Sequence, residues 1–116
     1  MGSYSFPKAE RLLKRADFLR LSRSGKKIRT RFFIAAVLDG TKENNRIGIT
    51  VSKRVGKAVE RNRIKRLIRE YYRHRRKTLS GNRDINIIAR KYVKFLSNSK
   101  VVEALDELFA RLKIQG

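Results

Sequence analysis

Cysteine is absent from this chain of 116 residues, and proline occurs once, at Pro7. Without cysteine, the chain has no disulfides, thiolate metal sites or thiol nucleophile. No apolar stretch approaches the about 20 residues that span a bilayer. The basic residues near the N-terminus also follow no apolar run, so a secretory signal is not expected. We therefore expect a soluble, intracellular and cytoplasmic protein with no membrane partner.

Acidic side chains are scarce, because ten Asp and Glu oppose 31 Lys and Arg and leave a formal net charge of +21. The length predicts a single domain over residues 1–116, with residues 1–9 as a flexible N-terminus. Self-repulsion of this size opposes compaction, so the charge is expected to serve an external polyanion. Nucleic acid fits this pattern better than a membrane surface does.

Residues that carry chemistry are also few. The only histidine, His74, lies within the basic run "RHRR", where a solvated or phosphate-facing role is expected. The acidic residues show no D-x-D or similar spacing of a two-metal site. We therefore predict no catalytic side chain and no metal site in the protein itself.

Three helices are predicted from apolar periodicity and from end signals. The first spans residues 15–24 and ends at Gly25. Its expected apolar side is Leu13, Phe18, Leu19 and Leu21. The second spans residues 57–77. The third follows the N-cap candidates Ser97, Asn98 and Ser99, and its expected core face is Val101, Leu105, Leu108 and Leu112.

Strands are predicted over residues 31–38, 47–51 and 84–90, with a further short strand near residues 26–29. The strands at 31–38 and 47–51 are expected to pair as a hairpin with a longer loop. The resulting order, α-β-β(-β)-α-β-α, predicts an α+β fold in which a small sheet packs with three helices.

The second helix, "AVERNRIKRLIREYYRHRR", holds eight Arg or Lys residues and only two Glu residues. Helical spacing gathers its apolar residues into one stripe, Ile64, Leu67, Ile68 and Tyr71. The same spacing gathers Asn62, Lys65, Arg66, Arg69 and Arg73 into a separate stripe. A solubilising surface normally mixes its signs, so this segregation indicates a face that binds a polyanion.

The turn before this helix extends the same pattern. Lys53, Arg54 and Lys57 precede the helix, and Gly56 is expected to adopt a positive φ there. Free amides and a partial positive charge at a helix N-terminus favour phosphate. A phosphate-binding position is therefore expected at this turn.

The segment "VSKRVGKAVERNRIKRLIREYYR" resembles the signature of the bacterial ribonuclease P protein family, whose RNR motif lies on a basic helix. Arg61, Asn62, Arg63, Lys65 and Arg66 match the core of that motif. "RADFLRLSRSGKKIRTRFF", "RIGITVSK" and "INIIARK" resemble the family's other elements in the right order. The resemblance covers roughly residues 10–112.

This resemblance implies a protein that binds a catalytic RNA and the single-stranded 5′ leader of precursor tRNA, with no obligate protein partner. The RNA would carry the active site and most of the Mg²⁺. The implied fold is a single-domain α/β sandwich of the ribosomal protein S5 domain 2-like type. It includes a left-handed β-α-β crossover through the basic helix.

The resemblance also implies two sets of site residues. The RNA-binding set is Lys53, Arg54, Lys57, Arg61, Asn62, Arg63, Lys65, Arg66, Arg69 and Arg73. The leader cleft would comprise Phe18, Ser22, Ile34, Ala36, Thr50, Arg61, Asn62 and Arg66. Ser22 and Ala36 stand where many relatives have aromatic residues, so stacking on the leader is expected to differ here. The alternative is a basic ribosomal-type RNA-binding protein without a processing role.

Overall fold

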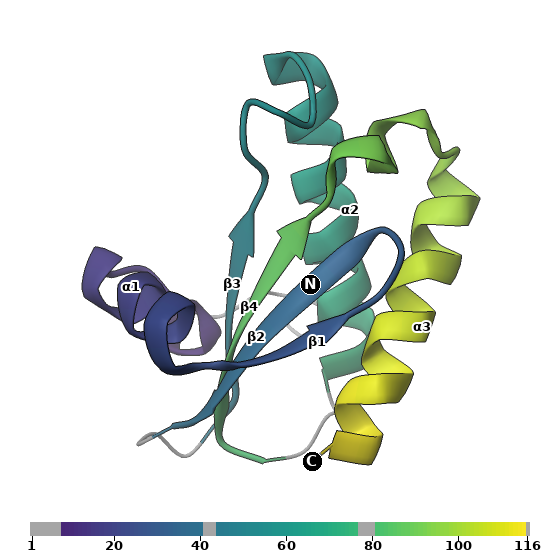
Figure 1. The fold of residues 1–116 in the computed structure, drawn as a ribbon. Coiled ribbons are helices and arrows are strands. Elements are labelled where there is room, and N and C mark those ends of the chain that lie inside the picture. The colour runs from purple at the N-terminus through teal and green to yellow at the C-terminus, as the bar shows by residue number, and fades with distance from the viewer. Residues whose placement is uncertain (1–7, 41–43, 77–80, 116) are drawn as a thin grey trace.

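The computed structural model describes residues 8–40, 44–76 and 81–115. Its elements are η2 (Lys8–Glu10), α1 (Arg15–Ser24), β1 (Lys26–Arg29), β2 (Phe33–Asp39), β3 (Arg46–Thr50), α2 (Ala58–Arg75), β4 (Arg83–Ala89), η4 (Lys91–Phe95) and α3 (Asn98–Gln115), where η marks a 3₁₀ helix (Figure 1). This order confirms the predicted α+β arrangement, including the short strand at Lys26–Arg29. The predicted end of the basic helix at Lys77 lies outside the described residues. So does most of the predicted flexible segment 1–9, although Lys8 and Ala9 form part of η2.

The four strands form one mixed sheet in the order β1-β2-β4-β3. β1–β2 and β2–β4 are antiparallel, whereas β3–β4 is parallel. The predicted hairpin between the strands at 31–38 and 47–51 is therefore wrong, because β4 lies between them. β4 is buried on both faces from Asp84 to Ile87, which favours a central position. α2 connects the parallel pair β3 and β4, where the family resemblance implied the left-handed crossover.

Helices cover the sheet on both faces, which makes the molecule an α/β sandwich (Figure 1). On one face, α2 and α3 share a large core with Phe33, Ala35 and Val37 of β2. On the other face, α1 covers a smaller cluster that includes Leu21 and Ala36. The alternation of β2 side chains between the two clusters follows the period of a strand.

The two long helices bury the apolar faces predicted for them. In α2 the buried stripe is Ile64, Leu67, Ile68 and Tyr71. In α3 the buried residues include Val101, Leu105, Leu108 and Leu112. Neither these helices nor any other that the structure describes is long and apolar enough to cross a membrane.

The apolar side expected for α1 is only half correct. Leu21 is fully buried and Phe18 packs against the same cluster, but Leu13 and Leu19 are 56% and 39% exposed. Leu19 is about 200° around the helix from Leu21 at ~100° per residue, so the two residues cannot face the sheet together. Leu13 precedes the helix and lies at the groove described below.

Candidate RNA interface

The turn into α2 is organised around Glu60 rather than around a positive-φ glycine. The Lys57 N–H donates to the Glu60 carboxylate at 2.9 Å, which is one half of a capping box. Gly56 does not have the expected positive φ, which Gly81 alone shows among the described glycines. A Cβ at Gly56 would lie 2.5 Å from Glu60 Oε1. Gly56 therefore gives the carboxylate room, and a protein anion already occupies one amide of the expected phosphate position.

Three cations of α2 and its C-terminal end are used inside the protein. Arg63 donates to Asn98 Oδ1 at 2.6 Å, to the Leu96 carbonyl at 2.8 Å and to the Lys94 carbonyl at 3.2 Å. Arg76 forms an ion pair with Glu10 at 2.8 Å. Arg75 lies over the Tyr71 ring and within 3.7 Å of Asp106. These contacts attach α2 to η2, η4 and α3.

A second group of α2 cations has no such contacts. No hydrogen bond or ion pair joins the side chains of this group to any residue that the structure describes; the group is Arg61, Lys65, Arg66, Arg69 and Arg73. The Nε atoms of Arg61 and Arg73 are shielded from solvent without an acceptor. With Asn62, these residues contain the cationic stripe expected from the sequence. We define this set of six residues as the α2 cationic face.

The structure thus divides the predicted RNA-binding residues. Lys53, Arg54 and Lys57 are exposed around the turn that leads to the α2 cationic face. Arg63 is different, because its guanidinium faces η4 and α3 and already makes three hydrogen bonds. The RNR triplet therefore contributes Arg61 and Asn62 to one surface and Arg63 to the internal structure.

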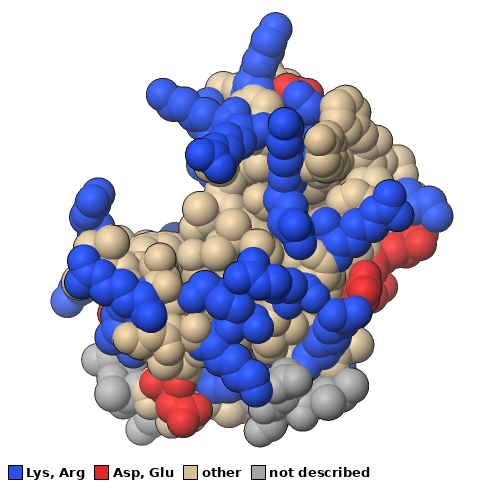
Figure 2. Space-filling model, viewed as in Figure 1, with Lys and Arg blue, Asp and Glu red and all other residues tan. Residues whose placement is uncertain are grey.

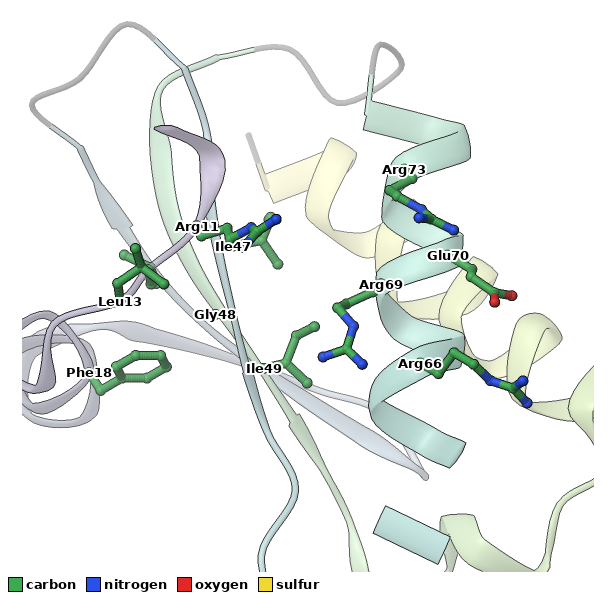
Figure 3. Close-up of a pocket in the computed structure, with 11 residues that line it drawn as sticks. Arg11, Leu13, Phe18, Ile47, Gly48, Ile49, Arg66, Arg69, Glu70 and Arg73 are labelled. Carbon is green, nitrogen blue, oxygen red and sulfur yellow. The ribbon is translucent and has the colours of Figure 1, made fainter. Parts of the chain in front are cut away.

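A groove of about 760 Å³ runs along the outer edge of β3. Its lining residues are Arg11, Leu12, Leu13, Phe18, Ile47, Gly48, Ile49, Arg66, Arg69, Glu70 and Arg73. Figure 3 shows the Phe18 ring extending from α1 toward Gly48, with the arginines on α2 across the strand. One wall is therefore apolar and the other cationic, which suits a ligand with flat apolar groups on an anionic backbone.

Gly48 allows Phe18 to lie against β3. A Cβ at this position would lie 2.5 Å from the Phe18 ring and 3.1 Å from Leu12. Phe18 therefore packs on the backbone of an edge strand while it also lines the groove. Its two predicted roles, core residue and ligand contact, are compatible in this geometry.

The other residues predicted for the leader cleft occupy different positions. Ile34 and Thr50 both pair with Ile88, so they lie in one row across the α1 side of the sheet. Ser22 is exposed on α1. Ala36 is only 1% exposed beneath α1, so its predicted contact with a leader is not supported. Its small side chain lets Leu21 approach the sheet.

The surface between α1 and the N-terminal end of α2 is hollowed, and Lys and Arg side chains stand on both rims (Figure 2). Acidic side chains occupy only small areas of this view. Positive charges around a concave surface attract an anionic chain, because the hollow focuses the electrostatic field of the protein.

A buried ionic network fixes α1 beside this hollow. Asp84 is 1% exposed and accepts from Arg46 at 2.7 and 2.9 Å and from Arg20 at 2.5 Å. Burial alone raises the pKa of Asp84, but the hydrogen bonds and charges of Arg46 and Arg20 outweigh it and lower that pKa. The hydrogen bond to Asp84 likewise raises the pKa of Arg46. The ionised side chains of Asp84, Arg46 and Arg20 therefore join β4, β3 and α1.

Sequence reasoning missed several of these residues. Arg11 and Leu12 reach the groove because their segment pairs with β3, where the Leu12 N–H donates to the Ile47 carbonyl at 3.0 Å. No local pattern predicts that contact, since the two segments are 35 residues apart. The Asp84 network was missed for the same reason. The acidic Asp84 at the start of the apolar run "DINIIA" was the only available signal.

Comparisons with known proteins agree with this fold. The family model described as Ribonuclease P matches residues 6–113. A ribonuclease P protein component from Desulforapulum autotrophicum is 67% identical over 112 residues, covering 97% of this chain and 96% of the relative. The ribonuclease P protein of Staphylococcus aureus superposes with a TM-score of 0.86 at 34% identity, covering 91% of this chain and 97% of that one. The ribonuclease P protein of Thermotoga maritima gives a TM-score of 0.79 at 32% identity, with coverage of 88% and 96%. The chain therefore belongs to the ribonuclease P protein family, as a protein subunit of that tRNA-processing enzyme.

Proposed function

We propose that the α2 cationic face binds the RNA subunit of ribonuclease P, while the hollow beside α1 holds the single-stranded 5′ leader of precursor tRNA. The observation that carries this proposal is the division of the α2 cations. Some are consumed by internal contacts, whereas Arg61, Lys65, Arg66, Arg69 and Arg73 have no partner among the described residues. Arginine suits this task because its planar donors match phosphate oxygens.

The leader is proposed to bind with little sequence selectivity. Phe18 offers a ring for stacking, and every base has a face that can stack. Thr50 and Asn62 offer polar groups near the same surface. Ser22 and Ala36 have no ring, so Phe18 is the one aromatic residue of the predicted leader set. Ala36 is also buried.

The Mg²⁺ of the reaction is proposed to be held mainly by RNA phosphates. Among residues 8–40, 44–76 and 81–115, no three His, Asp or Glu side chains gather into a possible metal site. The role proposed for the protein is to reduce phosphate repulsion between two RNAs and to hold the leader in place, in the cytoplasm and without an obligate protein partner.

Reconstitution tests this proposal. The chain is mixed with a bacterial ribonuclease P RNA at low Mg²⁺, and removal of the leader from precursor tRNA is followed. Stimulation by the wild-type chain and its loss in an Arg66→Ala/Arg69→Ala variant are expected. An Arg111→Ala/Lys113→Ala variant, which removes the same charge from the C-terminal end of α3, is the matched control and should retain stimulation.

Two outcomes would contradict the proposal. RNA binding without any stimulation of leader removal would favour the ribosomal-type alternative. Equal losses in the α2 and α3 variants would mean that total charge, rather than the α2 cationic face, determines binding.

A further inference from the structure

The short helix η4 exposes two aromatic side chains that the proposed function does not use. Tyr92 and Phe95 are 61% and 72% exposed. Their rings stack with centroids 6.3 Å apart and planes inclined by 24°. Val93, which lies between them in sequence, is fully buried and anchors the helix. Two adjacent rings held in water on an anchored helix indicate an interaction surface.

The charges around these rings specify the kind of partner. Lys91 Nζ lies 5.5 Å from the Tyr92 ring centroid, and Lys94 Nζ lies 5.2 Å from that of Phe95. From Ile85 to Val102 the chain carries four Lys or Arg residues and no Asp or Glu. Flat apolar faces beside ammonium groups match nucleobases beside phosphates. A second copy of this chain fits poorly, because each copy carries a net charge of +21.

The position of η4 indicates which RNA is within reach. Arg63 of α2 donates to the carbonyls of Lys94 and Leu96, so η4 is attached to the N-terminal half of α2. Val93 belongs to the core between the sheet and the helices α2 and α3. Figure 1 shows η4, in green between β4 and α3, on the α2 side of the sheet, with α1 on the other side. The RNA subunit proposed to bind α2 is therefore the neighbour of Tyr92 and Phe95. The 5′ leader proposed to lie beside α1 is not.

We propose that Tyr92 and Phe95 form a stacking platform for an unpaired base of the ribonuclease P RNA subunit. This inference rests on the proposed binding of that RNA to α2. The gap between the two rings is smaller than the ~7 Å that two successive stacking distances require. The base therefore stacks on the outer face of one ring, while Lys91 and Lys94 face the adjoining phosphates.

The test is the affinity of the RNA subunit for a Tyr92→Ala/Phe95→Ala variant, measured without any tRNA. A loss of about 5- to 150-fold is expected from the removal of stacking on one base. Because no cation is removed, the slope of log affinity against log salt should not change. A Lys91→Ala/Lys94→Ala variant should instead reduce that slope. Tyr92→Phe keeps the rings stacked and should retain wild-type affinity.

Both rings are exposed, so the double variant should unfold at the wild-type temperature, which separates lost binding from lost folding. Wild-type affinity of this variant for the RNA subunit would overturn the proposal. A loss seen only for precursor tRNA with a long leader would assign the platform to the substrate, and a loss of binding to anionic vesicles alone would assign it to a membrane. If the wild-type chain itself fails to bind the RNA subunit, the proposed function fails rather than this inference alone.

Discussion

At the scale of single residues, identical side chains on one helix do different work. Arg63 and Arg66 are both arginines of the basic motif, one turn apart on α2. Arg63 donates hydrogen bonds to Lys94, Leu96 and Asn98, whereas Arg66 lines the groove. The two residues are only about 60° apart around the helix, so the difference comes from their neighbours: η4 lies beside Arg63, and the groove lies beside Arg66. Arg63 reaches η4 and α3, and Arg66 does not.

Substituting each arginine with alanine should separate these roles. Arg63→Ala is expected to lower the free energy of unfolding by about 1–3 kcal/mol, because it removes three hydrogen bonds and leaves two partly buried carbonyls without a donor. Arg66→Ala should change stability by less than about 0.5 kcal/mol, yet reduce the salt slope of RNA binding by about 0.7–0.9. Urea unfolding and RNA titrations at several salt concentrations measure the two effects. Reversed results for the two variants would contradict this division.

Gly48→Ala provides a second test at this scale. The added Cβ would lie 2.5 Å from the Phe18 ring, so the ring must move from β3. We expect affinity for precursor tRNA to fall about threefold to tenfold, which is part of the ~1–3 kcal/mol from one stacked base. Affinity for mature tRNA, which has no leader, should stay constant. In a Phe18→Ala background the same substitution should have no further effect on leader binding, and an additive loss would refute the link.

At the scale of elements, α1 is held to the sheet by a small apolar cluster and by the Asp84 network. Leu12, Leu21 and Ala36 are the buried residues of that cluster. So small a core leaves a large share of the docking to Arg20, Arg46 and Asp84, whose ionised forms face one another. The position of α1 therefore depends on a buried charge that acid can remove.

An Asp84→Asn variant should show this dependence on pH. At neutral pH it is expected to be about 3–5 kcal/mol less stable than the wild type, because two arginines lose their carboxylate. The pKa of Asp84 is lowered by folding, so its contribution is fully present above the unfolded value of about 3.9. It is lost as pH falls through the lower folded value. The stability difference, measured by urea unfolding, should be constant above about pH 5 and shrink below about pH 4.

A constant difference down to the most acidic pH that the fold tolerates would contradict that assignment. Arg20→Lys is a useful companion, since it keeps the charge but loses the planar guanidinium. It should destabilise less than Arg20→Ala, which removes the charge as well.

At the scale of the whole molecule, the net charge of +21 is confined to a body with a radius of gyration of 13.3 Å. The screening length at 0.1 M salt is about 10 Å, which is shorter than the molecular extents of 36 × 35 × 27 Å. Repulsion in the free protein therefore acts mainly between neighbouring exposed cations. Binding of a polyanion removes this repulsion, so RNA binding and folding stability are linked.

Moderate salt should therefore stabilise the free protein. Raising NaCl from about 0.05 to 0.5 M is expected to increase the unfolding temperature by several degrees, because screening weakens the repulsion. The same change should weaken RNA binding, since the counterions released on binding become more concentrated. Differential scanning fluorimetry with and without RNA measures both effects. A fall in the unfolding temperature of the free protein would show that internal ion pairs outweigh the repulsion.

The sequence by itself determined the α-helices, the strands and the cationic stripe, because all three depend on local periodicity. The stripe from Asn62 to Arg73 and the buried stripe from Ile64 to Tyr71 follow from 3.6 residues per turn alone. The resemblance around Arg61 to Arg66 was sufficient for the family, which the comparisons confirmed. These features require no knowledge of which distant segments meet.

Only the tertiary structure decided which charges remain available for RNA. It inserted β4 between β2 and β3, buried Ala36 under α1, and joined Arg76 to Glu10 and Arg63 to η4. Each of these contacts joins segments that are 30 or more residues apart, or depends on the pairing of such segments. Sequence periodicity carries no information about such pairs, because the free energy of a long-range contact depends on the whole packed arrangement. The face of a helix is a local property, whereas the partner of that face is a property of the complete fold.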